Sequence, residues 1–571
     1  MKTPVFSRRA LGCALTFVLG FGLLQAADFT WNATSGAFTT GGNWVGGSAP
    51  ASGNSVFLTN GVVGAPATTT FVGSGNYLIM NFTSGAYNTF TVTTTPATNF
   101  LRFTGAFNNG GIIENGTGNV WFQLNNPAAT NPTAVSTNSG TIQAANPGVF
   151  WLDLSVSPSS PNLTNTGGLL LAKSGSTLRI NTAQTTTQTV IGGTLRSAAG
   201  GTIINSDSAA ALANLRLTDV TVDNQGTFTS AQQHTGTVAG SIRLVDTILM
   251  GTTVFTNAVG GTVNVLNTGG GTGLQPTQLN SSFTLTGNAS FDNRGLLNIT
   301  NDTTRTGASL TTNSLVFGIS STTATFRNTG TIRVVNDATA AGATAAFTSV
   351  NSITNEGTVR IKGNAGNTGA SFTVTGSGGN YTQSGAGVRT LLERGGLLSA
   401  ESVFITSGDL GGVGTVSGID VIIGSAGRVV VADTLGAGAG AGELLFNAHL
   451  TFDDGAQVLF ALGADTAGSG RVLLGSGYDL VIGDTVILSI SDLNGSATTG
   501  TTYRLFSLNG GSVTGTFVLD TLPAGWDGYL TMGADYVDFT FGPALIPEPS
   551  TYALLIGGLV VACVVGIRRR R

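Results

Sequence analysis

The sequence predicts an all-β protein, an elongated parallel β-helix, from three observations. Charged residues make up 9% of the 571 residues, against about 25% in ordinary globular domains. The 85 glycines occur with abundant Thr, Ser and Asn, a composition that disfavours helices and favours strands joined by tight turns. A short Asn-x-Gly motif also recurs at separations of about 30 residues, the scale at which solenoids repeat.

Residues 1–27 are predicted to be a secretory signal peptide. A basic start that ends at Arg9 precedes an apolar stretch at 10–24, and the small residues Ala26 and Ala27 suit cleavage by signal peptidase. The adjacent arginines leave the twin-arginine route open beside the general secretory route. We therefore expect signal peptidase as a processing partner.

Residues 28–60 are interpreted as an N-terminal cap. Trp31 and Trp44 lie among glycines just before the first alternating strand. The first coil of a solenoid has an open edge, and large aromatic side chains can cover it. A pair of aromatic platforms for sugar is the alternative function of these two residues.

Residues 61–408 are predicted to form the β-helix repeats. The clearest copies of the motif lie at 138–140, 165–167, 224–226, 293–295, 328–330 and 355–357. Asn tolerates left-handed backbone angles and Gly tolerates positive φ, so each copy is expected to bend the chain between two strands with inward apolar residues. Coils stacked at about 4.8 Å would bury these residues. The motif also suits β-hairpins, so a β-sandwich array is the alternative fold.

Residues 409–545 are predicted to continue the solenoid and to close it with a capping β unit. The stretch Leu-Gly-Gly-Val-Gly-Thr-Val-Ser-Gly at 410–418 resembles autotransporter-associated β-strand repeats and the C-terminal half of passenger domains. The resemblance implies a β-solenoid and no active site. Strong strand patterns at 480–488 and 536–539 are expected to form the cap.

Residues 546–571 are predicted to be a sorting signal with a short C-terminal transmembrane helix. The apolar run at 552–567 is a little shorter than the roughly 20 residues that usually cross a bilayer, and the basic cluster after it fits the positive-inside rule. Prolines before the run exclude a helix there and favour an extended peptide that a protease can reach. The residues predicted to carry the signal are Pro547, Glu548, Pro549, Ser550, Arg568, Arg569, Arg570 and Arg571.

This tail resembles the PEP-CTERM sorting signal, and the resemblance covers 546–571 only. It implies recognition and cleavage by an exosortase-type enzyme in bacteria that export extracellular polysaccharide. The implied location is first the inner membrane, through the transient C-terminal anchor. It is then the cell surface or extracellular matrix of a Gram-negative-type bacterium.

Cysteine and charge exclude several classes of protein. Cys13 lies in the predicted signal peptide and Cys563 in the tail, so disulfides and Cys-ligated zinc are excluded between them. With the seven basic residues and one acidic residue of the two termini set aside, residues 28–545 carry 17 basic and 27 acidic residues, a net charge of −10. A nucleic-acid partner is not expected, because it would need a basic face.

No residue of the sequence is predicted to be catalytic, cofactor-binding or metal-binding. His234 and His449 are far apart, and the adjacent Asp453 and Asp454 precede a glycine, which favours a turn over a shared site. We expect no cofactor. The predicted function is that of an exported, non-catalytic surface or matrix protein, structural or adhesive, that associates with exopolysaccharide. A polysaccharide lyase or hydrolase on a β-helix scaffold is the alternative.

Overall fold

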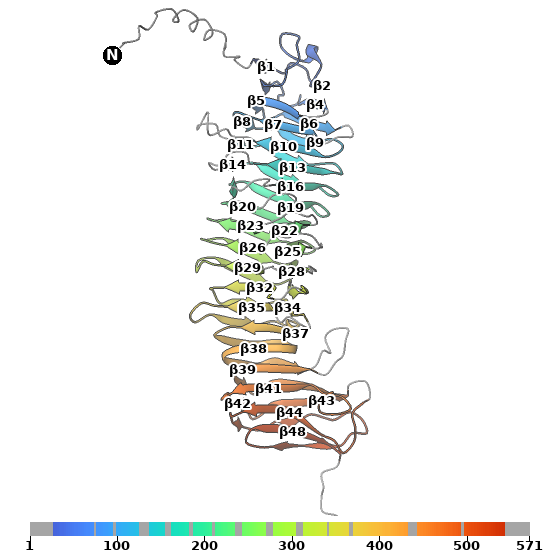
Figure 1. Cartoon of the computed structure of the whole chain (residues 1–571), viewed down its shortest axis with the longest axis vertical. Coiled ribbons are helices and arrows are strands. Elements are labelled where there is room, and N and C mark those ends of the chain that lie inside the picture. The colour runs from blue at the N-terminus through green and yellow to red at the C-terminus, as the bar shows by residue number, and fades with distance from the viewer. Residues whose placement is uncertain are drawn as a thin grey trace, which may run out of the picture.

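The protein is a long rod of stacked β-coils (Figure 1). In Figure 1 the N-terminal strands lie at one end of the rod and the C-terminal strands at the other. The computed structural model describes residues 27–542 apart from 74–75, 95–98, 125–135, 155–161, 182–186, 208–211, 235–241, 270–277, 304–311, 340–341, 365–368, 432–441 and 493–495.

Through the middle of the rod each strand pairs in parallel with the strand three places later, so each coil contributes one strand to each of three faces. The first face holds β7 (Asn99–Phe103), β10 (Val120–Leu124), β13 (Val149–Asp153), β16 (Thr177–Asn181), β19 (Thr202–Asp207), β22 (Thr227–His234), β25 (Thr262–Gly269), β28 (Leu296–Asn301), β31 (Thr331–Asn336) and β34 (Thr358–Lys362). The second face holds β8 (Phe107–Asn109), β11 (Ser136–Asn138), β14 (Asn162–Thr164), β17 (Thr187–Ile191), β20 (Leu212–Thr218), β23 (Ile242–Met250), β26 (Gln278–Leu285), β29 (Thr312–Ile319), β32 (Thr344–Ser349) and β35 (Ala370–Val374). The third face holds β9 (Ile112–Asn115), β12 (Thr141–Ala144), β15 (Leu169–Ala172), β18 (Thr194–Ser197), β21 (Thr221–Asn224), β24 (Val254–Asn257), β27 (Ser290–Asn293), β30 (Thr325–Asn328), β33 (Ile353–Asn355) and β36 (Asn380–Gln383).

The two ends of the rod are less regular. The N-terminal end holds β1 (Asp28–Thr30), β2 (Ser35–Ala37), the short 3-10 helix η1 (Gly41–Asn43), β3 (Asn54–Leu58), β4 (Ala67–Gly73), β5 (Asn76–Ser84) and β6 (Asn88–Thr94). The C-terminal part holds β37 (Arg389–Ser399), β38 (Ser402–Val431), β39 (Glu443–Phe452), β40 (Gln457–Leu462), β41 (Arg471–Ser476), β42 (Leu480–Ile482), β43 (Ile487–Asp492), β44 (Thr502–Asn509), β45 (Val513–Thr514), β46 (Val518–Leu519), β47 (Gly528–Met532) and β48 (Tyr536–Phe541).

Parallel pairing decides between the two predicted folds. Strands of a hairpin run antiparallel, whereas successive coils of this rod pair in parallel register, as when Thr262 lies opposite Leu296. Buried and partly exposed residues alternate along strands such as β28, β32 and β39, as expected when one face of the strand lines a core. The prediction of an all-β solenoid is therefore confirmed, and the array of hairpin sandwiches is wrong.

Buried asparagines form two hydrogen-bonded ladders along the rod. At the corner after the second face, Asn109 Nδ2 donates to Asn138 Oδ1 at 2.7 Å, and Asn138 Nδ2 donates to Asn165 Oδ1 at 2.6 Å. The longer ladder follows the third face, where each Asn Nδ2 donates to the next Asn Oδ1 at 2.7–2.8 Å through Asn224, Asn257, Asn293, Asn328 and Asn355. Ladder partners lie 27–36 residues apart, which matches the repeat length predicted from the sequence.

The physical reason predicted for the Asn-x-Gly motif is wrong at most copies. Among the described residues only Asp219 and Arg394 combine a side chain with positive φ, so the ladder asparagines are not left-handed. Gly330 and Gly357 also lack positive φ. A Cβ on Gly330 would instead collide with the carbonyl oxygen of Gly295 in the preceding coil, and one on Gly357 with that of Gly330. The motif thus requires Asn for a buried amide ladder and Gly for close approach of stacked corners.

Stacked phenylalanines fill the core beside the longer ladder. Phe283, Phe317, Phe347 and Phe372, on the second face, lie nearly parallel, with ring centroids 5.2, 5.2 and 4.2 Å apart. All four are fully buried. Aromatic pairs of this kind stabilise by about 0.5–1.5 kcal/mol each beyond the burial of their area. Asparagines therefore stack on asparagines in the polar ladder, and phenylalanines stack on phenylalanines in the apolar core.

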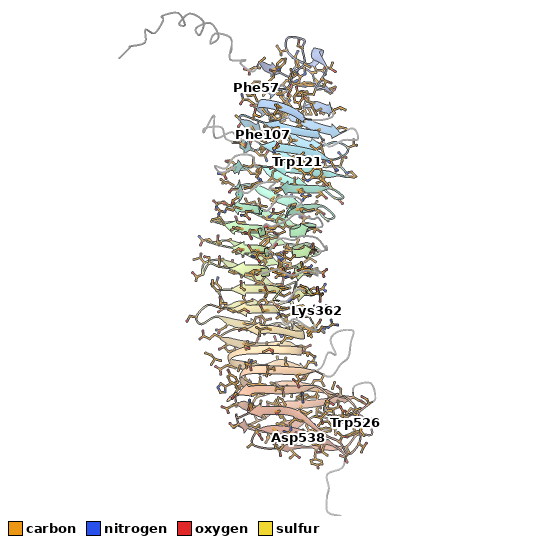
Figure 2. All side chains as sticks on the ribbon, viewed as in Figure 1. Phe57, Phe107, Trp121, Lys362, Trp526 and Asp538 are labelled. Atoms are coloured by element: carbon orange, nitrogen blue, oxygen red, sulfur yellow. The ribbon has the colours of Figure 1, made fainter. Side chains whose placement is uncertain are left out.

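Aromatic side chains and antiparallel strands occupy the two ends of the rod. Trp31 and Trp44 are 1% and 2% exposed and pack edge to face at 5.0 Å. Their burial removes the alternative in which they are exposed platforms for sugar. At the other end β48 pairs antiparallel with β44 and β47, and Arg504 donates to Asp538 at 2.5 Å. Figure 2 labels Asp538 in this last layer.

The predicted C-terminal transmembrane helix at 546–571 lies outside the described residues. Within the part of the chain that the structure describes, no helix has the length and apolar character needed to cross a bilayer.

Candidate functional site

The residues that the sequence predicts for sorting and processing lie almost entirely outside the described ranges. This holds for Ala26 and for Pro547, Glu548, Pro549, Ser550, Arg568, Arg569, Arg570 and Arg571. Ala27 is the first described residue and is exposed. Its backbone N–H donates to Asn54 Oδ1 at 3.3 Å, and its carbonyl accepts from Ser55 N–H at 3.0 Å. Regular pairing therefore begins directly after the predicted cleavage position.

The two histidines do not form a site. His234 ends β22, whereas His449 lies in β39 many coils further along the rod. His449 Nδ1 accepts a hydrogen bond from the backbone N–H of Asp479 at 3.1 Å, and its ring contacts Tyr478 edge to face. His449 thereby fixes the turn that precedes β42.

The adjacent carboxylates lie in a turn, as predicted. Asp453 accepts the N–H of Ala456 at 3.0 Å through its carbonyl oxygen, and Gly455 takes the left-handed backbone with φ of +83°. Asp454 Oδ1 accepts from the N–H of Asp484 in the next coil at 2.7 Å. Among the described residues no three His, Cys, Asp or Glu side chains gather closely enough to hold a metal ion.

A surface groove opens where the longer asparagine ladder ends. Asn355 lies opposite Gln383, and Thr358 lies opposite Arg389. The corner between Asn355 and Thr358 contains two residues, whereas the matching corner between Gln383 and Arg389 contains five. The longer corner cannot stack closely on its neighbour. It therefore leaves a groove between the stacked corners at this level of the rod.

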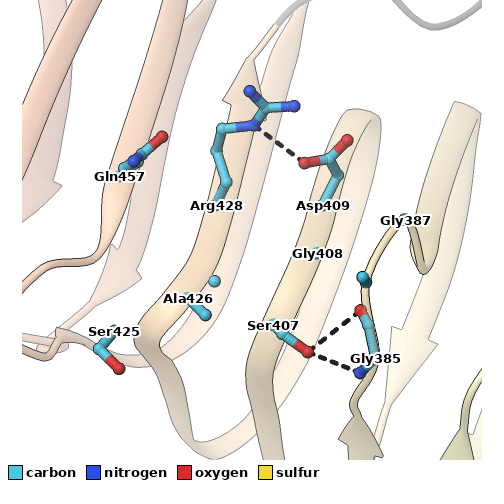
Figure 3. Close-up of a pocket in the computed structure, with 11 residues that line it drawn as sticks. Gly385, Gly387, Ser407, Gly408, Asp409, Ser425, Ala426, Arg428 and Gln457 are labelled. Carbon is cyan, nitrogen blue, oxygen red and sulfur yellow. Dashed lines mark hydrogen bonds and ion pairs between the residues drawn. The ribbon is translucent and has the colours of Figure 1, made fainter.

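Two adjoining hollows make up this groove, which we call the arginine groove. The larger has a volume of about 420 Å³ and is lined by 385–387, 407–409, 425–428 and Gln457 (Figure 3). The smaller has a volume of about 300 Å³ and is lined by Thr358, Arg360, Gly387, Arg389 and Leu391. Gly387 lines both hollows. These volumes fall at the lower end of the range of about 300–1,000 Å³ found for small-molecule sites.

Buried polar groups hold the backbone of the arginine groove. Gln383 takes the place of a ladder asparagine and is fully buried. Its Nε2 donates to the carbonyl oxygens of Ser407 at 3.0 Å and Asp409 at 3.1 Å. Ser407 Oγ accepts from the N–H of Gly385 at 2.6 Å and donates to its carbonyl at 3.2 Å, as Figure 3 shows. The polar floor is thus fixed by hydrogen bonds between two neighbouring coils.

Three arginines and two carboxylates supply the charge of the arginine groove. Arg428 Nε donates to Asp409 Oδ1 at 2.9 Å (Figure 3), and Arg389 Nε lies 3.8 Å from Asp409 Oδ2. Arg360 donates to Glu393 Oε2 at 2.8 Å. The arginine side chains are 41–49% exposed, whereas the two carboxylates are 10–11% exposed. The cations therefore face solvent while the anions lie beneath them.

This arrangement suits binding of an anion. Asp409 and Glu393 each have an arginine partner on a neighbouring coil and little solvent access. The exposed guanidinium groups above them offer planar N–H groups that match carboxylate geometry.

A pair of tryptophans is the other notable surface feature. Trp121 and Trp151 stack on neighbouring coils of the first face, with centroids 5.7 Å apart and ring planes 19° apart. Trp121 Nε1 donates to Asp153 Oδ2 at 3.3 Å; Figure 2 labels Trp121 near the N-terminal end. Each ring covers a face of the other. The pair therefore contributes to the stacking of these two coils on the first face.

The arginine groove could not be predicted from the sequence because its charged residues are separated by whole coils. Arg389, Asp409 and Arg428 become neighbours only through the register of β37 and β38. One signal was present: the Asn-x-Gly pattern loosens beyond Gly376. A break in a stacking motif marks a corner that no longer packs closely.

No protein-family model matches this chain, and comparison with curated proteins finds no match. The class of protein is therefore defined by the fold, an elongated parallel β-helix with antiparallel strands at its C-terminal end.

Proposed function

We propose that the protein is an exported, non-catalytic structural or adhesive component of the cell surface or of an extracellular polysaccharide matrix. The observation that carries this proposal is the continuous parallel pairing along the rod, held by the buried amide ladders. Such a rod is stiff because each coil is fixed to its neighbours by backbone and side-chain hydrogen bonds. It suits a spacer that presents the same surface at regular intervals.

The composition of the surface supports association with hydroxylated polymers. Charged residues are 9% of the chain, and Thr, Ser and Asn are abundant. Outward residues of β25 and β28, such as Asn264 and Asn298, bond to each other across coils at 3.2 Å. Weak hydrogen-bonding groups repeated along a rigid rod gain strength through multivalency.

The proposed route to the surface follows the two termini. The signal peptide at 1–27 would be removed by signal peptidase, which is consistent with β1 starting at Asp28. The tail at 546–571 would anchor the chain in the inner membrane until an exosortase-type enzyme cleaves near Pro547–Pro549. The protein would then reside at the cell surface or in the matrix.

We expect the exported protein to bind the exopolysaccharide of its own cells without degrading it. Protein recovered from the medium should have an intact mass that begins near Ala27 or Asp28 and lacks Arg568 to Arg571. It should co-sediment with the polysaccharide, and no reducing or unsaturated ends should appear.

Each readout of this experiment can contradict a different part of the proposal. Recovery of the full tail would reduce 546–571 to an ordinary anchor. Release of sugar ends would replace the structural role by that of a lyase or hydrolase. If the protein neither binds nor degrades the polysaccharide, a scaffold or protein-adhesion role without polysaccharide would remain.

A further inference from the structure

We propose that the arginine groove binds a carboxylate-bearing sugar unit of an acidic polysaccharide, with Arg389 as the contact to the carboxylate. The inference rests on the proposed association with polysaccharide and assigns it a site and a class of ligand. It follows from the charges, the exposure and the backbone of the groove.

Arg389 is the least satisfied cation of the groove. Its only ionic partner among the described residues is Asp409, at 3.8 Å, and Asp409 is already bonded to Arg428 at 2.9 Å. The described part of the chain provides no hydrogen-bond acceptor for the Arg389 guanidinium, which is 49% exposed. Guanidinium groups pair well with carboxylates because two parallel N–H groups match two oxygens.

The local charge of the groove, rather than the net charge of the protein, decides the sign of the charge that the ligand carries. Arg360, Arg389 and Arg428 face Glu393 and Asp409, so the groove has one excess positive charge. The other charges of the acidic rod are screened over about 8 Å at physiological ionic strength. A single carboxylate would neutralise the groove.

The walls supply contacts for sugar hydroxyls. Ser425 and Gln457 line the larger hollow and are exposed, so each offers donors and acceptors beside the cations. Gly408 must lack a side chain there, because its φ is +79° and a Cβ would collide with the carbonyl oxygen of Val388. Gly387 lines both hollows and a Cβ there would meet no atom within 4 Å, so its backbone is open to close approach by a ring.

The parallel stacking also gives the groove a direction. Arg360 and Arg389 line the smaller hollow, and Asp409, Arg428 and Gln457 follow on later coils in the larger one. The groove therefore runs along the rod, so a polymer can pass through it without ending there. This distinguishes a site for an internal sugar unit from a closed pocket for a free sugar.

The test measures binding of the full-length exported protein to three polymers: polygalacturonate, dextran sulfate and dextran. Wild type should bind polygalacturonate more tightly than dextran, and added salt should weaken this binding. Arg389→Gln should weaken it by about tenfold, the loss expected for a charge-assisted hydrogen-bonded contact. Arg327→Gln is the matched control, because Arg327 is 61% exposed and pairs with Glu356 outside the groove; it should bind like wild type.

Several outcomes would overturn the assignment. Unchanged binding of Arg389→Gln to polygalacturonate, with an unchanged circular dichroism spectrum, would remove the groove as the site and leave the proposed function intact. Tighter Arg389-dependent binding to dextran sulfate would replace the carboxylate by a sulfate. Failure of wild type to bind these polymers and the cells' own exopolysaccharide would contradict the proposed association with polysaccharide.

Discussion

Replacing Gly330 by alanine is expected to destabilise the coils around it by about 3 kcal/mol, at the upper end of the cost of overpacking. The new Cβ would meet the Gly295 carbonyl oxygen and the backbone carbon of Arg294 in the preceding coil. Neither is the end of a flexible side chain, so the two coils must separate. The longer asparagine ladder, which passes through Asn293 and Asn328, would then stretch at this point.

Amide hydrogen exchange of the strands next to Gly330 measures this loss, together with the urea midpoint of the whole rod. Gly42→Ala is the control, since Gly42 lacks positive φ and a Cβ there would meet no atom within 4 Å. Equal stability of the two variants would show that the motif glycines are not required for close stacking.

Replacing Asn293 by alanine should cost about 3 kcal/mol, because each buried polar group left without a partner costs about 1–3 kcal/mol. Asn257 Nδ2 would lose one of its two acceptors, at 2.7 Å, and Asn328 Oδ1 would lose its donor at 2.7 Å. The variant would also leave a small cavity, since Asn293 is fully buried. The rate of amide hydrogen exchange should rise in the coils on both sides of Asn293. This increase should become smaller with distance along the rod.

Asn108→Ala serves as the comparison for this variant. Asn108 is an exposed asparagine whose Oδ1 accepts from Thr137 at 2.7 Å. Its removal should change the stability by less than about 0.5 kcal/mol, as is usual for surface positions. A loss at Asn293 no larger than at Asn108 would mean that the ladder accompanies the fold without stabilising it.

The fold class could be predicted from the sequence because a solenoid repeats its constraints. Coils that stack on one another place the same residue types along a shared corner, so Asn and Gly recur at nearly equal separations. The local reason could not be predicted correctly. An Asn with left-handed backbone angles and an Asn in a buried ladder give the same motif in the amino-acid sequence. Only the stacking of the coils in the structure distinguishes them.

The sequence also could not tell that the motif lies at two different corners. Asn138 ends a strand of the second face and Asn165 directly follows one, whereas Asn224 and the later copies end strands of the third. Which face a copy follows depends on the lengths of all preceding coils. The arginine groove is hidden for the same reason, because Arg389 meets Asp409 only through the register of β37 on β38.

Small-angle scattering of the exported protein, combined with circular dichroism, tests most directly whether the chain is one uninterrupted parallel rod. With coils that rise by about 4.8 Å, we expect an asymmetric pair-distance distribution with a long tail and a β spectrum almost without helix. A compact, symmetric distribution or an appreciable helical signal would contradict the rod and the structural function proposed from it.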